Sequence, residues 1–249
     1  MQHKRIVIIS ATSLIAIHCA RRWMRNKSMT CILVGRSAQR IEPIAVDLRL
    51  RSPQSTIHVM EADFLSSESI ELTVERIISD GPVDTVLIAQ GSLPIQQDCE
   101  NDLALCQRTL LINGLSPVLF AEAFARHMEK ANQGTLILMG SVAGDRGRKS
   151  NYVYGAAKGL VDRYAQGLQH RFAKSKVNIV LIKPGPTNTP MTAHLHAQGM
   201  KLAQVEDVAR TIVLSIQQGK TIIYAPRIWR VIMHMIRIIP RSIFNRLPL

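Results

Sequence analysis

The chain has 249 residues, of which 47% are apolar and 4% aromatic, and its formal net charge is +13. This length suits a single α/β domain with an aliphatic core. The four cysteines have neither the spacing of a metal site nor the density of a disulfide scaffold, so no metal is expected. A basic chain can bind nucleic acid, an anionic membrane or an acidic ligand, but no nucleic-acid recognition motif is present. We therefore expect no nucleic-acid partner.

The amino-terminal residues 1–5 lead directly into an apolar run at residues 6–9. A secretory signal peptide needs a longer apolar region followed by a cleavage site. A cytoplasmic location is therefore expected.

Short, mostly β-branched runs alternate with longer segments of helical spacing along the chain. The runs predict strands at residues 6–9, 30–34, 56–59, 83–88, 135–139, 177–182 and 221–224. The segments predict helices at residues 15–23, 41–50, 70–78, 105–127, 154–172 and 205–216. The alternation predicts a Rossmann-type, doubly wound α/β fold, with a seven-stranded parallel sheet and helices on both faces. We assign residues 1–226 to this Rossmann-fold domain and residues 227–249 to a basic amphipathic carboxyl-terminal segment.

Candidate catalytic residues follow the fifth predicted strand. Tyr154 and Lys158 are four residues apart on a predicted helix, so they share one face. A nearby ammonium favours the phenolate and should lower the pKa of Tyr154 towards the working range of a general acid or base. Ser141, at the carboxyl end of a strand, is placed to hydrogen-bond a substrate carbonyl. Asn113 lies in the middle of a predicted helix, where an amide side chain is unfavourable, which suggests a role other than helix formation.

These four residues, with the later run at residues 184–189, resemble the signature set of the short-chain dehydrogenase/reductases over essentially the whole chain. The resemblance implies that Tyr154 transfers the proton and that Lys158 also holds the nicotinamide ribose. It further implies that Ser141 orients the carbonyl and Asn113 supports a water-linked proton path. The alternatives are a packing role for Tyr154 and a helix-cap role for Ser141.

The same resemblance assigns cofactor contacts. The first turn has Ser10, Leu14 and Ala16 where the family pattern has glycines. A residue larger than glycine restricts the backbone of a phosphate-binding turn. Arg36 follows the second strand, where a carboxylate would indicate NAD, so NADP(H) is favoured over NAD(H), with Arg22 or Arg40 as helpers; the alternative is an ordinary surface arginine. The full expected set is Ser10, Thr12, Ser13, Ile15, Arg36, Asp63, Gly91, Tyr154, Lys158, Pro184, Thr187 and Thr189.

The carboxyl-terminal segment carries basic side chains at intervals of three and four residues, namely Arg227, Arg230, His234, Arg237 and Arg241. The intervening positions are apolar. This pattern is too polar and too short to span a membrane, but it suits a helix that lies in the interface of an anionic membrane. The alternative is a helix packed on the sheet or on a partner subunit.

The runs at residues 141–151 and 239–248 resemble one branch of the family, the reductase subunits of decaprenylphosphoryl-ribose epimerases. This resemblance implies a keto-pentose on a polyprenyl phosphate as substrate, a flavin-dependent oxidase as partner, and a location at the inner face of the membrane. Arg146, Arg148 and Lys149 would then meet a phosphate, although a solvated basic loop is the alternative. The wider family resemblance also implies a homo-oligomer.

The leading hypothesis is an NAD(P)-dependent reductase that converts a ketone to an alcohol. Two alternatives stay open. One is a dehydrogenase of a free hydrophobic alcohol, and the other is a membrane-associated scaffold that keeps the fold and binds no cofactor.

Overall fold

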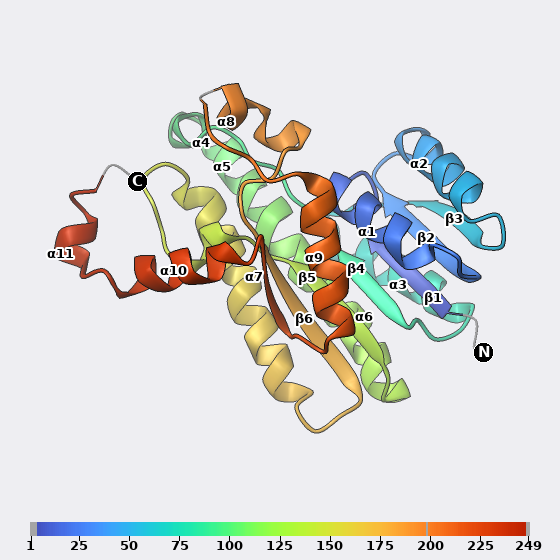
Figure 1. Cartoon of the computed structure of the whole chain (residues 1–249). Coiled ribbons are helices and arrows are strands. Elements are labelled where there is room, and N and C mark those ends of the chain that lie inside the picture. Colours follow the sequence, from blue (N-terminus) through green and yellow to red (C-terminus); the bar gives the residue numbers. More distant parts are fainter. Residues whose placement is uncertain (1–3, 198, 248–249) are drawn as a thin grey trace.

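The computed structural model describes residues 4–197 and 199–247. The outer ends of the two predicted segments, residues 1–3 and 248–249, lie outside the described residues. Seven parallel strands form one sheet in the order β3-β2-β1-β4-β5-β6-β7 (Figure 1). Their bounds are β1 Lys4–Ile9, β2 Met29–Gly35, β3 Thr56–Glu61, β4 Thr85–Ile88, β5 Gly134–Met139, β6 Val177–Pro184 and β7 Ile222–Ala225.

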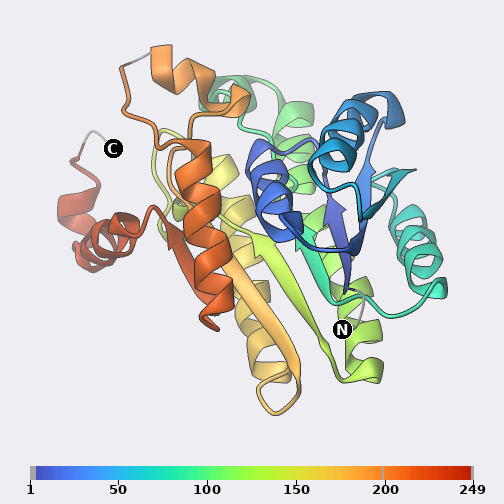
Figure 2. The same cartoon turned by 45° about the vertical axis from the view of Figure 1, so that its right-hand side comes forward.

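Helices cover both faces of the sheet (Figure 2). The core on one face is built from α3, α6 and α7, and the core on the other from α1, α2 and α9. The helices are α1 Leu14–Met24, α2 Ala38–Arg51, α3 Ser67–Ser79, α4 Gln96–Asn101, α5 Leu103–Leu110, α6 Ser116–Ala131, α7 Tyr152–Arg171, α8 Ala193–Ala197, α9 Val205–Gln217, α10 Ile228–Ile238 and α11 Arg241–Phe244. The predicted doubly wound α/β fold is therefore confirmed.

The strand order reverses at β1, which pairs with β2 on one side and β4 on the other. The connection after β1 leads to β2 on one side of it, and the connection after β4 leads to β5 on the opposite side. In doubly wound sheets, ligands bind in the crevice at this switch point. The topology thus directs the first turn and the loops after β4, β5 and β6 to the same end of the sheet.

The helix predicted at residues 105–127 consists of α5, a π-helical turn at Leu111–Leu115, and α6. Among the described residues, this stretch, Leu103–Ala131, is long and apolar enough to cross a membrane by length and composition alone. Phe120 and Phe124 within it are fully buried against the sheet. The stretch is therefore a core helix of the domain.

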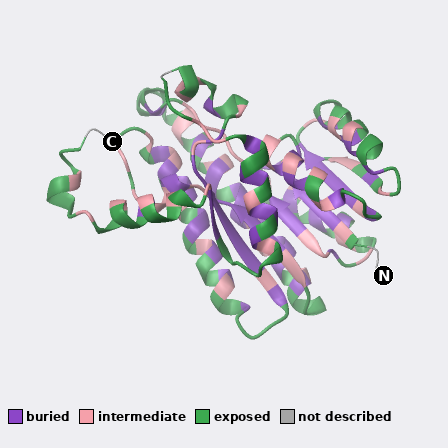
Figure 3. Ribbon diagram, viewed as in Figure 1, coloured by how far each residue is buried: buried purple, intermediate pink, exposed green. Residues whose placement is uncertain are grey.

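The carboxyl-terminal helices α10 and α11 extend away from the sheet, and most of their surface is exposed (Figure 3). Within α10 and α11, only Met233 is fully buried, in a small cluster with Val142 and Tyr224. The boundary between residues 226 and 227 stays a prediction, because this packing does not show whether residues 1–226 fold alone.

Candidate active site

A cleft of about 400 Å³ opens at the carboxyl ends of the central strands. Its lining comes from the first turn, the loops after β4 and β5, helix α7 and the segment after β6. Eleven of the residues predicted from the sequence line it, namely Ser10, Thr12, Ser13, Ile15, Gly91, Ser141, Tyr154, Lys158, Pro184, Thr187 and Thr189. Residues from five separate parts of the chain thus meet at one place.

Lys158 is almost completely buried beneath this cleft. Its Nζ atom donates hydrogen bonds to the carbonyl oxygens of Met139, at 2.9 Å, and Gln90, at 3.1 Å. Met139 is the last residue of β5 and Gln90 lies two residues after β4, so the lysine joins α7 to the carboxyl ends of these two strands. Burial lowers the pKa of Lys158 to about 7, because no carboxylate compensates the desolvated ammonium. Lys158 can therefore exchange a proton near neutral pH.

Tyr154 lies one turn before Lys158 on α7, and the lysine Nζ is 5.9 Å from the centre of the tyrosine ring. Burial raises the pKa of Tyr154, and a hydrogen bond with Ser141 opposes this shift. The expectation of a lowered tyrosine pKa was therefore wrong. Desolvation of the phenolate outweighs any stabilisation by Lys158, whose charge is distant and whose own pKa is lowered. Tyr154 is held as a phenol, which is the form that donates a proton.

Ser141 caps the short helical turn after β5. Its side-chain oxygen accepts a hydrogen bond from the backbone N–H of Ala143, at 3.1 Å. The same hydroxyl also hydrogen-bonds Tyr154. Ser141 therefore has the alternative capping role and also lies beside the predicted proton donor.

Asn113 does not line the cleft but is fully buried directly behind it, in the π-helical turn. Its amide nitrogen donates to the carbonyl of Thr109, at 2.9 Å, and its oxygen accepts from the backbone N–H of Ser92, at 2.9 Å. A β-carbon added to Gly91 would lie 3.3 Å from that oxygen and 3.8 Å from Lys158 Nζ. Single π turns occur frequently at functional sites, and this one fixes the loop that borders Lys158.

The first turn keeps an unusual backbone conformation without its glycine. Ser10 has a φ angle of 66°, in the left-handed region that glycine adopts readily and other residues rarely do. Ser13 caps the following helix through a 3.5 Å contact with the N–H of Ala16. Ala16 is completely buried and Leu14 borders the cleft. The first turn therefore carries backbone strain at Ser10.

Arg36 and Asp63 lie apart from the other predicted residues. Both line a neighbouring hollow of about 540 Å³ at the ends of β2 and β3. Asp63 accepts a hydrogen bond from the N–H of Leu65, but the N-cap of the following helix α3 is Ser66, so Asp63 does not cap that helix. Of the two helper arginines, Arg40 lines the main cleft. Arg22 is an exposed residue of α1 and lines neither hollow.

The segment after β6 folds over the cleft. Thr187 is buried, and its hydroxyl donates to the carbonyl of Gly185 at 2.9 Å. Thr189 and Thr192 form a reciprocal cap at the start of a short helical turn, and the Thr192 hydroxyl also donates to Thr187. The segment from Pro184 to Thr192 is therefore a hydrogen-bonded unit beside the cleft, which we call the Thr189 flap; residue 198, further along, lies outside the described residues.

Three residues of the cleft, one of which is the predicted Arg148, share a property that the sequence did not reveal. Within the described residues, only three buried side-chain polar atoms lack a hydrogen-bond partner: Gln90 Oε1, Arg148 Nε and Asn151 Oδ1. All three residues line the same cleft. Unpartnered buried polar groups are rare because they are costly, and their concentration at one place indicates a site for a polar ligand. Gln90 and Asn151 were not predicted, and of these two only Gln90, two residues after β4, had a position that gave a sequence signal.

Arg146 and Arg148, expected together at a phosphate, have different surroundings. Arg146 donates to the backbone carbonyls of Ile236 and Ile239 and lies 3.7 Å above the ring of Phe244. It is therefore engaged in holding the carboxyl-terminal helices. Lys149 is exposed, so of the three basic residues only Arg148 lines the cleft.

The half-buried Tyr154 and the buried Lys158 thus lie at the carboxyl ends of the central strands, where doubly wound sheets bind dinucleotides. The family model described as short chain dehydrogenase matches residues 4–199, and the chain belongs to this family of oxidoreductases.

Relatives of similar length carry the same general description. An uncharacterized oxidoreductase of Mycobacterium tuberculosis is 29% identical over 245 residues, covering 98% of this chain and 96% of the relative. Another, from Streptomyces coelicolor, is 25% identical over 244 residues, with the same coverage of both chains.

Solved structures share the fold. A short chain dehydrogenase from Burkholderia cenocepacia in complex with NADP has a TM-score of 0.82 at 15% identity, covering 100% of this chain and 98% of that one. A short-chain dehydrogenase from Sphingobium yanoikuyae in complex with NADPH has a TM-score of 0.79 at 18% identity, covering 96% and 97%. At this identity the likeness is one of fold.

Proposed function

We propose that this oxidoreductase uses NADP(H) to reduce a ketone to an alcohol, and that its substrate is a keto-sugar carried on a polyprenyl phosphate. The observation that carries the substrate class is Arg148, a half-buried guanidinium that lines the cleft with no ion pair or hydrogen bond to any described residue. Burial lowers the pKa of Arg148, so desolvation of its charge is not compensated within the protein. A phosphate of the substrate would compensate it.

Two features of the cleft support a dinucleotide cofactor. Lys158 and the Thr189 flap border the place where the nicotinamide ribose would lie, and the first turn retains its left-handed residue at Ser10. NADPH, when bound, supplies the hydride. The orphaned Gln90 Oε1 is an additional acceptor within the cleft.

The protein's own groups handle the proton. Ser141 donates a hydrogen bond to the ketone oxygen, which polarises the carbonyl and fixes it beside Tyr154. Tyr154 Oη then gives its proton to the forming alkoxide, and its raised pKa suits the reduction direction because the phenol persists at neutral pH. Lys158, with a pKa of about 7, returns a proton to Tyr154 through water near Asn113.

The preference for NADP(H) rests on two arginines. Arg36 at the end of β2 and Arg40 at the start of α2 offer guanidinium groups where the adenosine 2′-phosphate would lie. Arg36 occupies the sequence position after β2 where a carboxylate would favour NAD, and this supports NADP(H) as the cofactor.

The substrate class implies two associations. A flavin-dependent oxidase would generate the ketone, and the inner face of the membrane would be the place where a polyprenyl phosphate is met. Homo-oligomer formation is a further proposal, from family resemblance. A free hydrophobic alcohol is the competing substrate, favoured by the apolar lining from Leu93, Met191 and Leu195.

Fluorescence titration with NADPH and NADH tests the cofactor proposal on the wild type, Arg36→Ala and Arg40→Ala. We expect tight NADPH binding that weakens about tenfold or more in either variant, because a charge-assisted bond to a phosphate is lost, while NADH binding changes little. Failure of both nucleotides to bind at millimolar concentration would contradict the proposal. The cofactor-free scaffold, favoured by Leu14 in the first turn, would then be the better hypothesis.

A further inference from the structure

Helix α10 has two apolar faces, and only one of them is covered. Met233 and the partly buried Trp229 and Ile236 pack towards the domain. On the other side, Ile228, Val231, Met235 and Ile238 are between 52% and 68% exposed. Their spacing of three, four and three residues places them in one line along the helix. We call these four residues the apolar stripe. Ile243 of α11, also exposed, continues the apolar surface.

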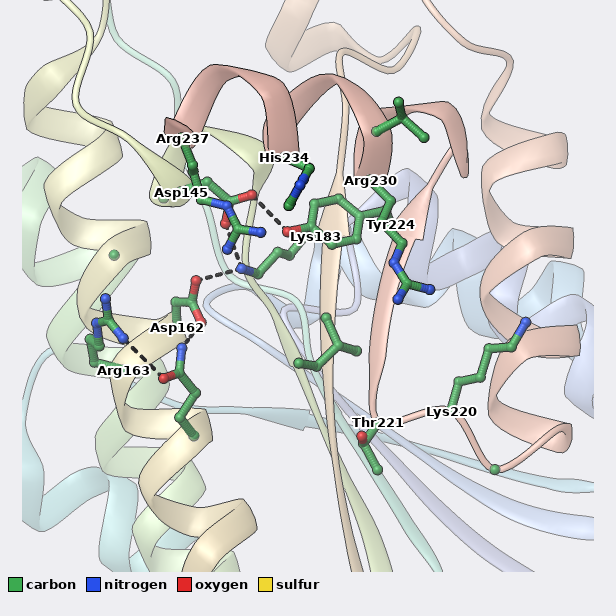
Figure 4. A pocket seen from close by; sticks show the side chains of 16 residues that line it. Asp145, Asp162, Arg163, Lys183, Lys220, Thr221, Tyr224, Arg230, His234 and Arg237 are labelled. Carbon is green, nitrogen blue, oxygen red and sulfur yellow. Dashed lines mark hydrogen bonds and ion pairs between the residues drawn. The ribbon is translucent and has the colours of Figure 1, made fainter. Parts of the chain in front are cut away.

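A basic face lies along the same helix, on one flank of the apolar stripe. Arg230, His234 and Arg237 extend from α10 into a groove of about 960 Å³ between α10, α7 and β7 (Figure 4). Within the described residues, none of these three side chains has a hydrogen bond or an ion pair to a carboxylate. The acidic groups of the groove are already engaged, because Asp145 and Asp162 both pair with the buried Lys183. The basic face is therefore available to an external anion.

We propose that α10 binds the surface of an anionic phospholipid bilayer, with the apolar stripe among the acyl chains and the basic face at the lipid phosphates. Eleven residues form a helix of roughly 16 Å, about half the thickness of a hydrocarbon core, so the helix lies in the interface and does not span it. An exposed apolar line beside arginines matches the chemistry of such a surface. The chain has no acidic residue after Asp207 to oppose this attraction.

Charge complementarity favours a membrane over a second copy of the chain as the occupant. Two copies joined stripe to stripe would bring two sets of arginines close together around an apolar centre, and like charges repel there. Anionic lipids compensate the same arginines. The bilayer therefore satisfies both faces of α10 together.

The proposed membrane face is mechanically joined to the cleft. Trp229 packs so closely on Gly185 that an added β-carbon there would overlap the indole ring. Arg146 holds the other end of α10 through the carbonyls of Ile236 and Ile239. Gly185 lines the cleft, and Arg146 follows the turn that Ser141 caps. Membrane contact would thus set the orientation of the cleft relative to the lipid surface.

Vesicle sedimentation tests the proposal on the full chain, using phosphatidylcholine vesicles with and without phosphatidylglycerol. The wild type should sediment with the phosphatidylglycerol vesicles. Met235→Ser with Ile238→Ser should weaken partitioning by about tenfold or more for each side chain removed from the acyl region. Arg230→Gln with Arg237→Gln should weaken it about fivefold per arginine, and only on anionic vesicles.

Matched controls change the same residue types elsewhere. Leu50→Ser alters an exposed leucine of α2 (76% exposed), and Arg25→Gln with Arg108→Gln removes two exposed arginines far along the chain from α10. Neither should change partitioning to the same degree. NADPH titration of every variant separates loss of membrane binding from loss of the proposed enzymatic function.

Equal partitioning of the wild type and both α10 variants would overturn the proposal. Sedimentation velocity without lipid can give a second result that would overturn the proposal. If the stripe variant converts a dimer into a monomer while vesicle binding is unchanged, the apolar stripe joins two copies of the chain.

Discussion

The Nζ atom of Lys158 lies 2.9 Å from the carbonyl oxygen of Met139, two residues before Ser141 in the chain. One buried amine thus fixes helix α7 to β5, the strand that leads into the turn capped by Ser141, the proposed substrate-orienting residue. A neutral amine has two N–H groups and can satisfy both the Met139 and Gln90 carbonyls, which agrees with a pKa of about 7.

This burial predicts a pH dependence of stability. Between pH 7 and about 10, Lys158 is protonated in the unfolded chain but neutral in the folded one. The free energy of unfolding therefore rises with pH in this window and gains nothing below pH 7, where both states are protonated. Relative to Lys158→Met, the wild type should gain roughly 1 kcal/mol per pH unit above pH 7. Urea unfolding of both proteins without nucleotide, over this pH range, measures the two free energies of unfolding. If both depended on pH in the same way, the predicted burial of the charge would be contradicted.

Ser10→Gly should stabilise the protein. The substitution removes a left-handed serine that costs about 1 kcal/mol, so the melting temperature should rise by about 2 °C, measured by circular dichroism. NADPH binding should not weaken. Ser13→Gly is the matched control, because Ser13 has a φ angle of −66° and caps α1, and it should bring no gain. A loss of stability in Ser10→Gly would show that the serine side chain outweighs the strain.

Tyr154→Phe should abolish turnover while leaving the cofactor site intact. Removal of the proton donor should lower kcat by about 10² to 10⁴-fold, and the NADPH dissociation constant should change little. Stopped-flow kinetics with an activated ketone and fluorescence titration measure the two quantities. Retention of most of the activity would exclude Tyr154 as the proton donor.

Arg148→Gln should separate anionic from neutral substrates. With a short prenyl-phosphate keto-pentose, kcat/KM should fall about 10- to 100-fold, because a charge-assisted bond to the phosphate is lost. With the neutral methyl glycoside of the same keto-pentose it should stay nearly unchanged. Lys149→Gln removes the adjacent exposed charge and serves as the control. Equal loss with both substrates would contradict a phosphate contact and favour a structural role for Arg148.

Arg146→Ala should release α10. The variant leaves the carbonyls at the end of α10 without their donor and removes the stacking on Phe244. Trypsin should then cleave after Arg237 and Arg241 about tenfold faster, since local unfolding of the segment becomes easier. In the control Arg163→Ala, which removes an exposed arginine bonded only to Gln166, cleavage should match the wild type.

Several features of this protein were predictable from local sequence. The alternation of short β-branched runs and amphipathic segments specified the parallel sheet, because a period of two or 3.6 residues is a property of neighbouring positions. Tyr154 and Lys158 were found for the same reason, as their four-residue spacing places both on one helix face. The basic periodicity after residue 226 likewise predicted α10.

Other features depended on residues that are distant in the chain. The sign of the pKa shift of Tyr154 follows from its burial, which no spacing reveals. Arg146, Arg148 and Lys149 look alike as neighbours in sequence, yet one holds α10, one lines the cleft and one is exposed. The separation of Arg36 and Asp63 into a neighbouring hollow also depends on how β2 and β3 end relative to the cleft.

The sequence by itself determined the order and type of the elements, the parallel sheet and the Tyr–Lys pair, because these arise from periodicity and short spacing. Only the tertiary structure decided which polar groups are left without partners and which apolar face of α10 remains uncovered. Burial and hydrogen bonding depend on what packs against a residue, and those neighbours come from elsewhere in the chain.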